Sequence, residues 1–424
     1  MAYETKKIKE GITIHTIETE KFKTNLIAVF LTVPLKRKTV TNYALIPAVL
    51  KRGTNFLKTQ EEINIKLEEM YDASFDCGID KVGDNQVIKC YLEALNDEFT
   101  LNNEQILKQS LDLIFEIIFN PLIENSSFKE EYVKTEKENM KKLILSKIDN
   151  KDKYALETCI EEMYKGKDYG IYKFGYIEDL EHITAKNLYD AYLELINKAK
   201  IDIFVSGKID KQEILKEIEE NQNLNKLNPR IPNIVKNTEE TEIKEAVEPK
   251  EIKDIKEVSQ GKVVIGLDIA YNKKDSRYQM ALYNVILGES ATSKLFQNVR
   301  EKASLAYSAR SNYIRQKNNI YIRCGIEIEK YEEALKIIKE QLEDMKNGNF
   351  SEEDLNNAKK YMLAGIRTVQ DEQDSEVTYY FGQEISGTFT TFDEYMNKIN
   401  GVSRDEIIEV ANSIKINTIY FLRN

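Results

Sequence analysis

Two residues in the second half of the chain could act together on a peptide. Arg300 lies near the end of an expected short helix at 293–303, and Tyr307 opens the alternating strand that follows at 305–313. A guanidinium group offers several donors to a carboxylate or a peptide carbonyl, and a phenol adds one more donor. The spacing allows both side chains to point toward one concavity, although by itself it favours a surface arginine and a half-buried tyrosine.

The elements around this pair are expected to hold it in place. An apolar helix at 275–287 ends at Leu287-Gly288, and a turn of small residues follows. The next helix is amphipathic and should turn Leu295, Phe296 and Val299 toward the core. The pair would therefore lie where a packed helix passes into a strand.

The rest of the chain predicts alternating strands and helices. In the first half we expect strands at 11–16 and 25–34, paired at the start of a sheet, further strands at 74–80, 86–94 and 201–205, and helices at 43–51, 59–71, 103–118, 128–148, 151–165 and 184–196. In the second half we expect further strands at 262–271, 318–328 and 418–422, and further helices at 330–346, 351–370, 372–386 and 403–413.

Two short echoes indicate that the second half repeats the first. The sequence F-K-E-E at 128–131 returns as F-S-E-E at 350–353, and the segment at 177–180 matches the segment at 392–395. A repeat of this length predicts two copies of one α+β domain and not a solenoid. We expect domains at 1–220 and 259–424, with 221–258 as an exposed, proline-containing linker.

Composition narrows the class of protein. The chain has 424 residues, of which 42% are hydrophobic and 31% charged, so a soluble globular protein with more than one core is expected. Its net charge of −11 disfavours a nucleic-acid partner. The longest apolar run, Leu26 to Leu35, is too short to cross a membrane, and the first residues lack the apolar core of a signal peptide. We therefore expect a cytoplasmic protein with no membrane partner.

Neither the cysteines nor the histidines predict a metal site. The four cysteines, Cys77, Cys90, Cys159 and Cys324, lie far apart without a C-x-x-C motif, which is typical of separate buried thiols in a reducing compartment. His15 and His182 are the only histidines, and both are expected to be surface or helix-cap imidazoles. A zinc peptidase needs three protein ligands and an open position. We predict no metal and no other cofactor.

The order of elements and several motifs resemble the pitrilysin/insulinase family of zinc peptidases, which use H-x-x-E-H. The matching stretch, 44–54, reads A-L-I-P-A-V-L-K-R-G-T and keeps the Gly-Thr that follows the family motif. The histidine positions fall on Ala44 and Ala48, and the glutamate position falls on Pro47. The family's distal glutamate would fall near Leu143 or near Glu138, depending on the register. The resemblance implies a chain that cannot hydrolyse peptides alone.

The same resemblance gives the arginine and tyrosine a role. The family pattern S-x-L-F-x-x-L-R-E-x-x-x-L-x-Y is similar to residues 293–307, with Arg300 and Tyr307 at the matching positions. In the family these residues hold the substrate backbone and help to stabilise the developing oxyanion above the zinc. The implied fold is two α/β-roll domains, each a mostly antiparallel sheet with helices packed on one face, which together form half of a clam shell.

Some members of this family divide the work between two chains, one with the zinc motif and one with the arginine and tyrosine. This chain resembles the second kind, and is also similar to the zinc-less member of a bacterial pair associated with the 5-aminopentanol modification of elongation factor P. We therefore expect a non-catalytic subunit that contributes Arg300 and Tyr307 to a homologous zinc-bearing partner acting on a peptide or unfolded protein. The alternatives are an inert scaffold, a homodimer that binds peptides without cutting them, and an unrelated enzyme reusing the chamber.

Overall fold

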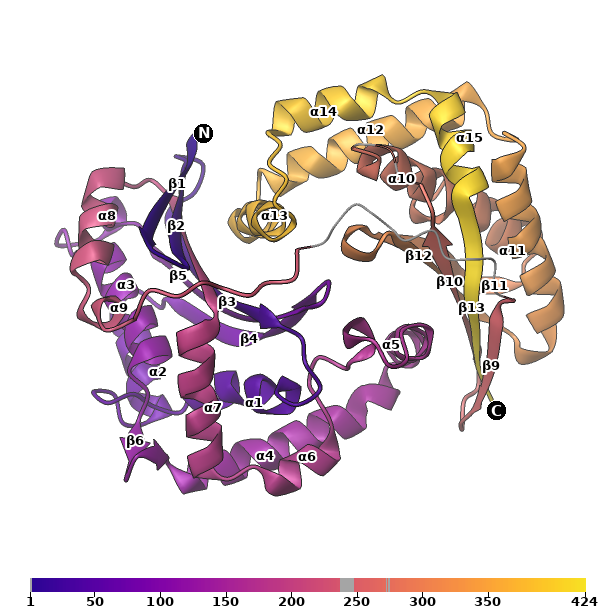
Figure 1. The fold of residues 1–424 in the computed structure, drawn as a ribbon. Helices are drawn as coiled ribbons and strands as arrows, with labels where there is room; N and C mark the ends of the chain where they lie inside the picture. The colour runs from indigo at the N-terminus through magenta and orange to yellow at the C-terminus, as the bar shows by residue number, and fades with distance from the viewer. Residues whose placement is uncertain (1, 237–247, 272, 274) are drawn as a thin grey trace. The chain divides into compact units, whose positions relative to one another are not determined.

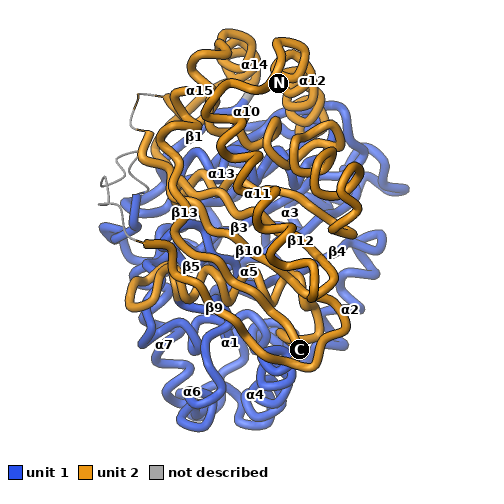
Figure 2. Tube along the Cα trace, turned by 90° about the vertical axis from the view of Figure 1, so that its right-hand side faces the viewer, with its two compact units in different colours: residues 1–145, 171–236, 370–385 blue, residues 146–170, 237–369, 386–424 orange. Residues whose placement is uncertain are grey.

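The computed structural model describes residues 2–236, 248–271, 273 and 275–424, which fall into two compact units (Figure 2). Unit 1 takes residues 1–145, 171–236 and 370–385, and unit 2 takes 146–170, 237–369 and 386–424. The boundary between the units therefore crosses the chain several times and does not follow the sequence halves.

Unit 1 is built on a six-stranded sheet with the strand order β1-β2-β8-β3-β5-β4. The strands are β1 (Ala2–Lys9), β2 (Ile12–Glu18), β3 (Thr24–Pro34), β4 (Ser74–Val82), β5 (Asn85–Leu95) and β8 (Lys200–Gly207). Neighbouring strands are antiparallel except for β2 and β8, which are parallel. Strand β3 was predicted as a strand, and its largely apolar sequence is buried on both faces.

Helices cover both faces of this sheet. The elements of unit 1 are α1 (Val40–Leu50), α2 (Gln60–Glu69), α3 (Ile106–Phe119), α4 (Glu130–Leu145), α6 (Ile177–His182), α7 (Ala185–Lys198), α8 (Lys211–Glu220), α9 (Gln222–Asn225) and α13 (Gln373–Ser386), with a small hairpin of β6 (Ile123–Glu124) and β7 (Ser127–Phe128). Helices α1, α3 and α7 pack on one face and bury the larger core there, and α13 lies on the opposite face (Figure 1). Gln373 at the start of α13 donates to the backbone oxygens of Thr24 and Ser206, and Phe381 stacks on Phe30.

Unit 2 repeats this plan with one strand fewer. Its sheet has the order β11-β12-β10-β13-β9, and β13 and β9 are its parallel pair. The elements are β9 (Lys250–Ile255), β10 (Gly261–Ile269), β11 (Ala306–Ile314), β12 (Asn319–Ile326), β13 (Ile414–Arg423), α5 (Lys151–Met163), α10 (Arg277–Asn284), the π-helical turns η4 (Val285–Glu289) and η5 (Phe296–Lys302), α11 (Tyr331–Lys346), α12 (Glu352–Val369), α14 (Phe392–Gly401) and α15 (Arg404–Ser413). The strand order β2-β8-β3-β5-β4 in unit 1 corresponds to the order β9-β13-β10-β12-β11 in unit 2. The predicted α+β duplication is thus visible in the topology.

Two equivalent helices are exchanged between the units. Helix α5 comes from the first half of the sequence but packs on β10 and β13 of unit 2. Helix α13 occupies the same position in the second repeat, yet it packs on the sheet of unit 1. Each sheet therefore receives one covering helix from the other half of the chain.

Several details differ from the sequence predictions. Strand β1 was not expected, because its sequence A-Y-E-T-K-K-I-K has no apolar alternation. Strands β2 and β3 are not neighbours, because β8 lies between them, and a long-range parallel pairing of this kind leaves no local signal. Within the predicted linker 221–258, the structure has α9 and β9, and residues 237–247 lie outside the described residues.

The prediction of four separate thiols is wrong for two of the cysteines. Cys77 on β4 and Cys90 on β5 lie directly opposite each other in the strand register and form a disulfide. The register of a hairpin, which the spacing of cysteines along the chain does not show, brings them together. Cys159 and Cys324 are free and buried, as predicted, and burial raises the pKa of both thiols to about 12. Among the helices that the structure describes, none combines the length and apolar character needed to cross a bilayer.

Candidate functional site

Helix α1 has the position of the family's zinc motif but none of its ligands. Ala44 and Pro47 are buried in the unit 1 core, and Ala48 is half-buried. Methyl groups and a pyrrolidine ring have no lone pair to offer a metal ion. Pro47 also lies inside the helix, where it lacks the N–H of an ordinary helical hydrogen bond. These residues do not fit zinc, so no hydrolytic step can be assigned to them.

A carboxylate does remain beside α1, and the chain neutralises it with its own cation. Glu136 on α4 is buried, and Arg52, just after the end of α1, donates from Nε to its Oε1 at 2.6 Å and from a terminal nitrogen to the same oxygen. The ion pair takes up the negative charge that a metal would otherwise balance. The two registers considered for the family's distal glutamate pointed to Glu138 and Leu143 and not to Glu136. Glu138 is exposed and Leu143 is largely exposed. A helical period counted from the buried Val133 and Met140 would have selected position 136.

Arg300 lies on the surface of unit 2 in the π-helical turn η5. Its side chain is 43% exposed, its Nε is 3.5 Å from Glu301 Oε1, and its guanidinium lies 4.6 Å from the centre of the Phe296 ring. Leu295 and Val299 are buried, as predicted, but Phe296 is only half-buried. In the π-helical turn Val299 keeps its place in the core, whereas Phe296 lies at the edge of the core. As a result, the phenyl ring supports the arginine instead of filling the core.

Tyr307 lies at the start of β11, next to η5, and is 65% exposed. The register of β11 against β12 shifts between Ala306 and Ser308, so Tyr307 falls within a β-bulge. A bulge re-aims a side chain at the edge of a sheet. The phenol is thereby presented to solvent on an edge strand, adjacent to the turn with Arg300, and both residues are available to a ligand.

The backbone around the pair is packed tightly by a glycine. A Cβ added to Gly288 would lie 2.6 Å from Ser311 Oγ and 2.7 Å from Ser311 N. Any side chain at this position would therefore push η4 away from β11. The sequence predicts the end of the apolar helix at Leu287-Gly288. In the structure, Gly288 is the residue that lets η4 pack directly against β11, the strand of Tyr307.

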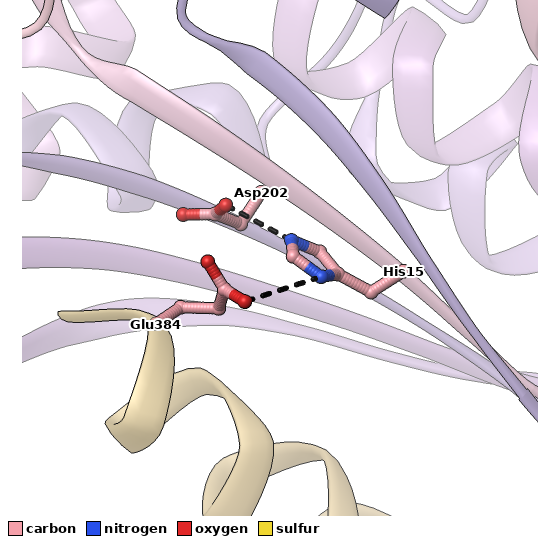
Figure 3. Close-up of side chains that lie close together, drawn as sticks. All are labelled: His15, Asp202 and Glu384. Atoms are coloured by element: carbon pink, nitrogen blue, oxygen red, sulfur yellow. Dashed lines mark hydrogen bonds and ion pairs between the residues drawn. The ribbon is translucent and has the colours of Figure 1, made fainter. Parts of the chain in front are cut away.

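A second polar cluster lies between the sheet of unit 1 and α13 (Figure 3). His15 and Asp202 are fully buried, with 3.0 Å between His15 Nε2 and Asp202 Oδ1, and His15 Nδ1 is 4.0 Å from Glu384 Oε1. The Tyr3 hydroxyl lies 2.9 Å from His15 Nδ1 and donates to Glu384 at 3.2 Å. The prediction of a surface or helix-cap His15 is wrong, because β2 becomes an inner strand once β1 is added at the edge.

The cluster has the donor types of a metal site, but its charges are already matched. His15, Asp202 and Glu384 place one ligand atom each within 4.8 Å of one another. However, the Lys200 ammonium lies 2.9 Å from Asp202 Oδ1 and 3.6 Å from Glu384 Oε2. Although burial raises the pKa of Asp202, the hydrogen bond from His15 and the charge of Lys200 bring it below its usual value. Lysine supplies the cation here, so the arrangement favours a structural network over a metal centre.

With this geometry in view, the relatives are informative. A family model described as the peptidase M16 inactive domain matches residues 182–362. Over 421 residues the chain is 32% identical to the probable inactive metalloprotease YmfF of Bacillus subtilis (strain 168), covering 99% of this chain and 97% of that protein. The chain belongs to the peptidase M16 family.

Solved structures agree with the M16 assignment. A conserved protein from Enterococcus faecalis V583 superposes with a TM-score of 0.90 and 26% identity, over 100% of this chain and 99% of that one. A structure described as the peptidase M16 inactive domain from Pseudomonas fluorescens has a TM-score of 0.79 at 17% identity, over 100% and 98% of the two chains, and supports the fold alone. This chain is an inactive M16 peptidase homologue of the pitrilysin/insulinase type.

Proposed function

We propose that this M16 homologue is the non-catalytic subunit of a heterodimeric zinc peptidase. Its partner would be a homologous chain that bears the H-x-x-E-H zinc site, and its substrate an extended peptide or unfolded protein segment. Arg300 would donate to backbone carbonyls of that segment, and Tyr307 would add a donor to the oxyanion that develops at the partner's zinc.

One observation carries this proposal. The zinc ligands are absent from α1, whereas Arg300 and Tyr307 remain at the positions that match the family and are both exposed. A bulge and a packed π-helical turn hold the two residues at the surface. Exposed donors held by a rigid support are what a peptide-binding surface requires. An inert scaffold has no need for either residue.

The test is a reconstitution with the zinc-bearing M16 homologue from the same organism. We expect an unstructured fluorogenic peptide to be cleaved by the mixture and by neither chain alone. Tyr307→Phe should lower kcat/KM of the mixture by about 10²- to 10³-fold, the usual cost of losing one oxyanion donor, and Arg300→Ala should lower kcat/KM through weaker binding of the peptide backbone. Arg367→Ala is the matched control, because Arg367 is an exposed arginine on α12 of the same unit.

Two results would contradict the proposal. If the partner alone cleaves the peptide as fast as the mixture, this chain adds nothing to catalysis. If the Arg300→Ala and Tyr307→Phe variants both leave the rate of the mixture unchanged, the chain serves as a scaffold. A tight homodimer in analytical ultracentrifugation that excludes the partner would also overturn the heterodimer.

The finer assignments remain part of the proposal. A role with elongation factor P and its 5-aminopentanol modification is suggested by similarity to a zinc-less bacterial member of the family, and a cytoplasmic location is part of the same proposal. Cleavage of the modified and unmodified elongation factor by the reconstituted pair would test the first of these directly.

A further inference from the structure

Two arginines face each other on the sheet of unit 2. Arg310 on β11 and Arg323 on β12 are directly paired in the antiparallel register. Residues opposed in this way share one face of the sheet, with their Cβ atoms about 5 Å apart. Like charges in such a pair oppose folding, so two neighbouring guanidinium groups are not expected from stability alone.

Among the described residues, neither arginine of this pair has an ion-pair partner, and Asp152 acts on Arg323 only from beyond ion-pair distance. Arg310 is exposed, and Arg323 is half-buried: one of its terminal nitrogens donates to Asn312 Oδ1, whereas its Nε is enclosed and without a hydrogen-bond partner. Burial lowers the pKa of Arg323 and the charge of Arg310 lowers it further, while the more distant charge of Asp152 opposes this shift without reversing it. A ligand carboxylate could relieve the repulsion and satisfy the unused donors.

A third cation lies on the same face. Lys262 on β10 pairs with Gly325 on β12, two residues from Arg323. A Cβ at Gly325 would lie 3.2 Å from Lys262 Nζ and 3.3 Å from Ser308 Oγ, so the lysine extends across the strand toward β11. Asp152 on α5 lies 3.1 Å from Lys262 Nζ and balances that charge. The two arginines therefore keep a net positive charge in a chain whose total charge is −11.

The arginine pair lies close to the proposed peptide-binding residues. Arg310 follows Tyr307 by three residues on β11, which is about 10 Å along an extended strand. A peptide in extended conformation covers the same distance in about three residues. Since β11 continues past Arg310 to Ile314, a bound chain can pass over the pair with a side chain directed at it.

We propose that Arg310 and Arg323 form a subsite for an aspartate or glutamate side chain of the bound peptide, about three residues from the residue that Tyr307 holds. This inference deepens the proposed function and rests on it in one respect, namely that the occupant is a peptide. It assigns the substrate class: extended segments with an acidic residue at a fixed distance from the scissile bond.

The experiment measures peptide binding to the full chain without its partner. Three unstructured peptides carry a neutral fluorescent dye: one with a single glutamate and an amidated end, one with glutamine in its place, and the glutamine peptide with a free carboxyl end. We expect the glutamate peptide to bind about three- to tenfold more tightly than the glutamine peptide in fluorescence anisotropy. The difference should shrink when the salt concentration rises from 50 to 500 mM.

Matched variants separate this subsite from the rest of the site. Arg310→Gln, at an exposed position, should abolish the preference for glutamate, and Arg323→Gln should do the same, whereas Arg367→Gln should leave it unchanged. Arg300→Ala should weaken the glutamate and glutamine peptides alike and so leave their ratio intact. Circular dichroism of each variant confirms that the fold is retained.

Each other outcome decides against a specific claim. Equal affinity for the glutamate and glutamine peptides overturns the subsite and leaves the proposed role of Arg300 standing. Tightest binding by the peptide with the free carboxyl end shows that the pair holds a chain terminus, which overturns the side-chain assignment. Failure of all three peptides to bind contradicts peptide binding by this chain, and the subsite with it.

Discussion

Arg52 and Glu136 are 84 residues apart in the sequence, and two nitrogens of Arg52 donate to a single carboxylate oxygen of Glu136. Glu136 is buried on α4, and Arg52 lies four residues beyond Ala48, where the family has its second histidine. Arg52 thus supplies the positive charge beside this buried carboxylate. The helix pair α1 and α4 therefore holds Glu136 satisfied without any further ligand.

The Arg52–Glu136 pair should be strongly coupled in stability. Arg52→Met leaves a buried carboxylate without its cation, and we expect this to cost about 3 kcal/mol, while Arg52→Met with Glu136→Gln should recover most of the loss. A double-mutant cycle in urea unfolding measures the coupling. Lys51→Met, beside Arg52 but paired with the exposed Asp76, is the control and should have little effect. Equal losses in Arg52→Met and in the double variant would show that the unpaired carboxylate of Glu136 is not the cause of the loss.

The contact of α13 with the unit 1 sheet should weaken as the pH rises. Glu376 on α13 is fully buried, neither of its carboxylate oxygens has a partner in the described part of the chain, and burial raises its pKa to about 7. The unfolded carboxyl group ionises near pH 4.5, so between pH 4.5 and 7 the unfolded state binds fewer protons than the folded state. The contribution of Glu376 to stability is therefore fully present below pH 4.5. It is lost as the pH rises through 7, by up to about 3 kcal/mol.

Replacing this carboxyl group tests the sign directly. Glu376→Gln should raise the stability of α13 at pH 8 and leave it unchanged at pH 4.5, as measured by hydrogen exchange of the α13 amides. The groups around Glu376 are Lys21, whose charge lowers its pKa, and Tyr380 on the same helix. Glu372→Gln, at an exposed position on the preceding turn, is the control. A pH-independent gain in stability would contradict the titration.

The His15–Asp202 pair should act as structure and not as a metal site. Asp202 has a lowered pKa, so its contribution to stability is present above pH 4 and is lost as the pH falls through its folded pKa. His15→Ala should cost about 2 to 4 kcal/mol and move acid unfolding to a higher pH, because the buried carboxylate loses a partner. Zinc and calcium should leave the Tm unchanged. A rise in Tm with either ion that His15→Ala abolishes would establish a metal centre instead.

The sequence predicts the regular parts of this fold well, because its signals are local. Thr59 with Glu62 marks the start of α2, and the Thr59 side chain accepts from the Glu62 amide in the structure. The apolar run at 25–34 becomes the central strand, and Leu295 and Val299 are buried where the helical period places them. The positions of Ala44, Pro47 and Ala48 came from the resemblance to the family motif, and all three lie on α1.

What the sequence could not predict depends on contacts between distant segments. The pairing of Cys77 with Cys90 follows from strand register, and the burial of His15 follows from β1 and β8 closing on either side of β2. The helical period of α4 could have placed Glu136 on the buried face, but its pairing with Arg52 depends on the packing of α4 against α1. The opposition of Arg310 and Arg323 likewise needs the hairpin register of β11 and β12, since thirteen residues separate them in the chain.

The reciprocal placement of α5 and α13 limits how this protein can be dissected. A cut between residues 237 and 247, the obvious place to separate the two halves of the gene, would leave Val264 and Tyr420 without α5 and Phe30 without Phe381. Each fragment would expose an apolar sheet face and recruit the other fragment, or aggregate. The two fragments should therefore reassemble into a folded protein when they are expressed together. A circular permutation that keeps both helices should fold where simple truncation fails.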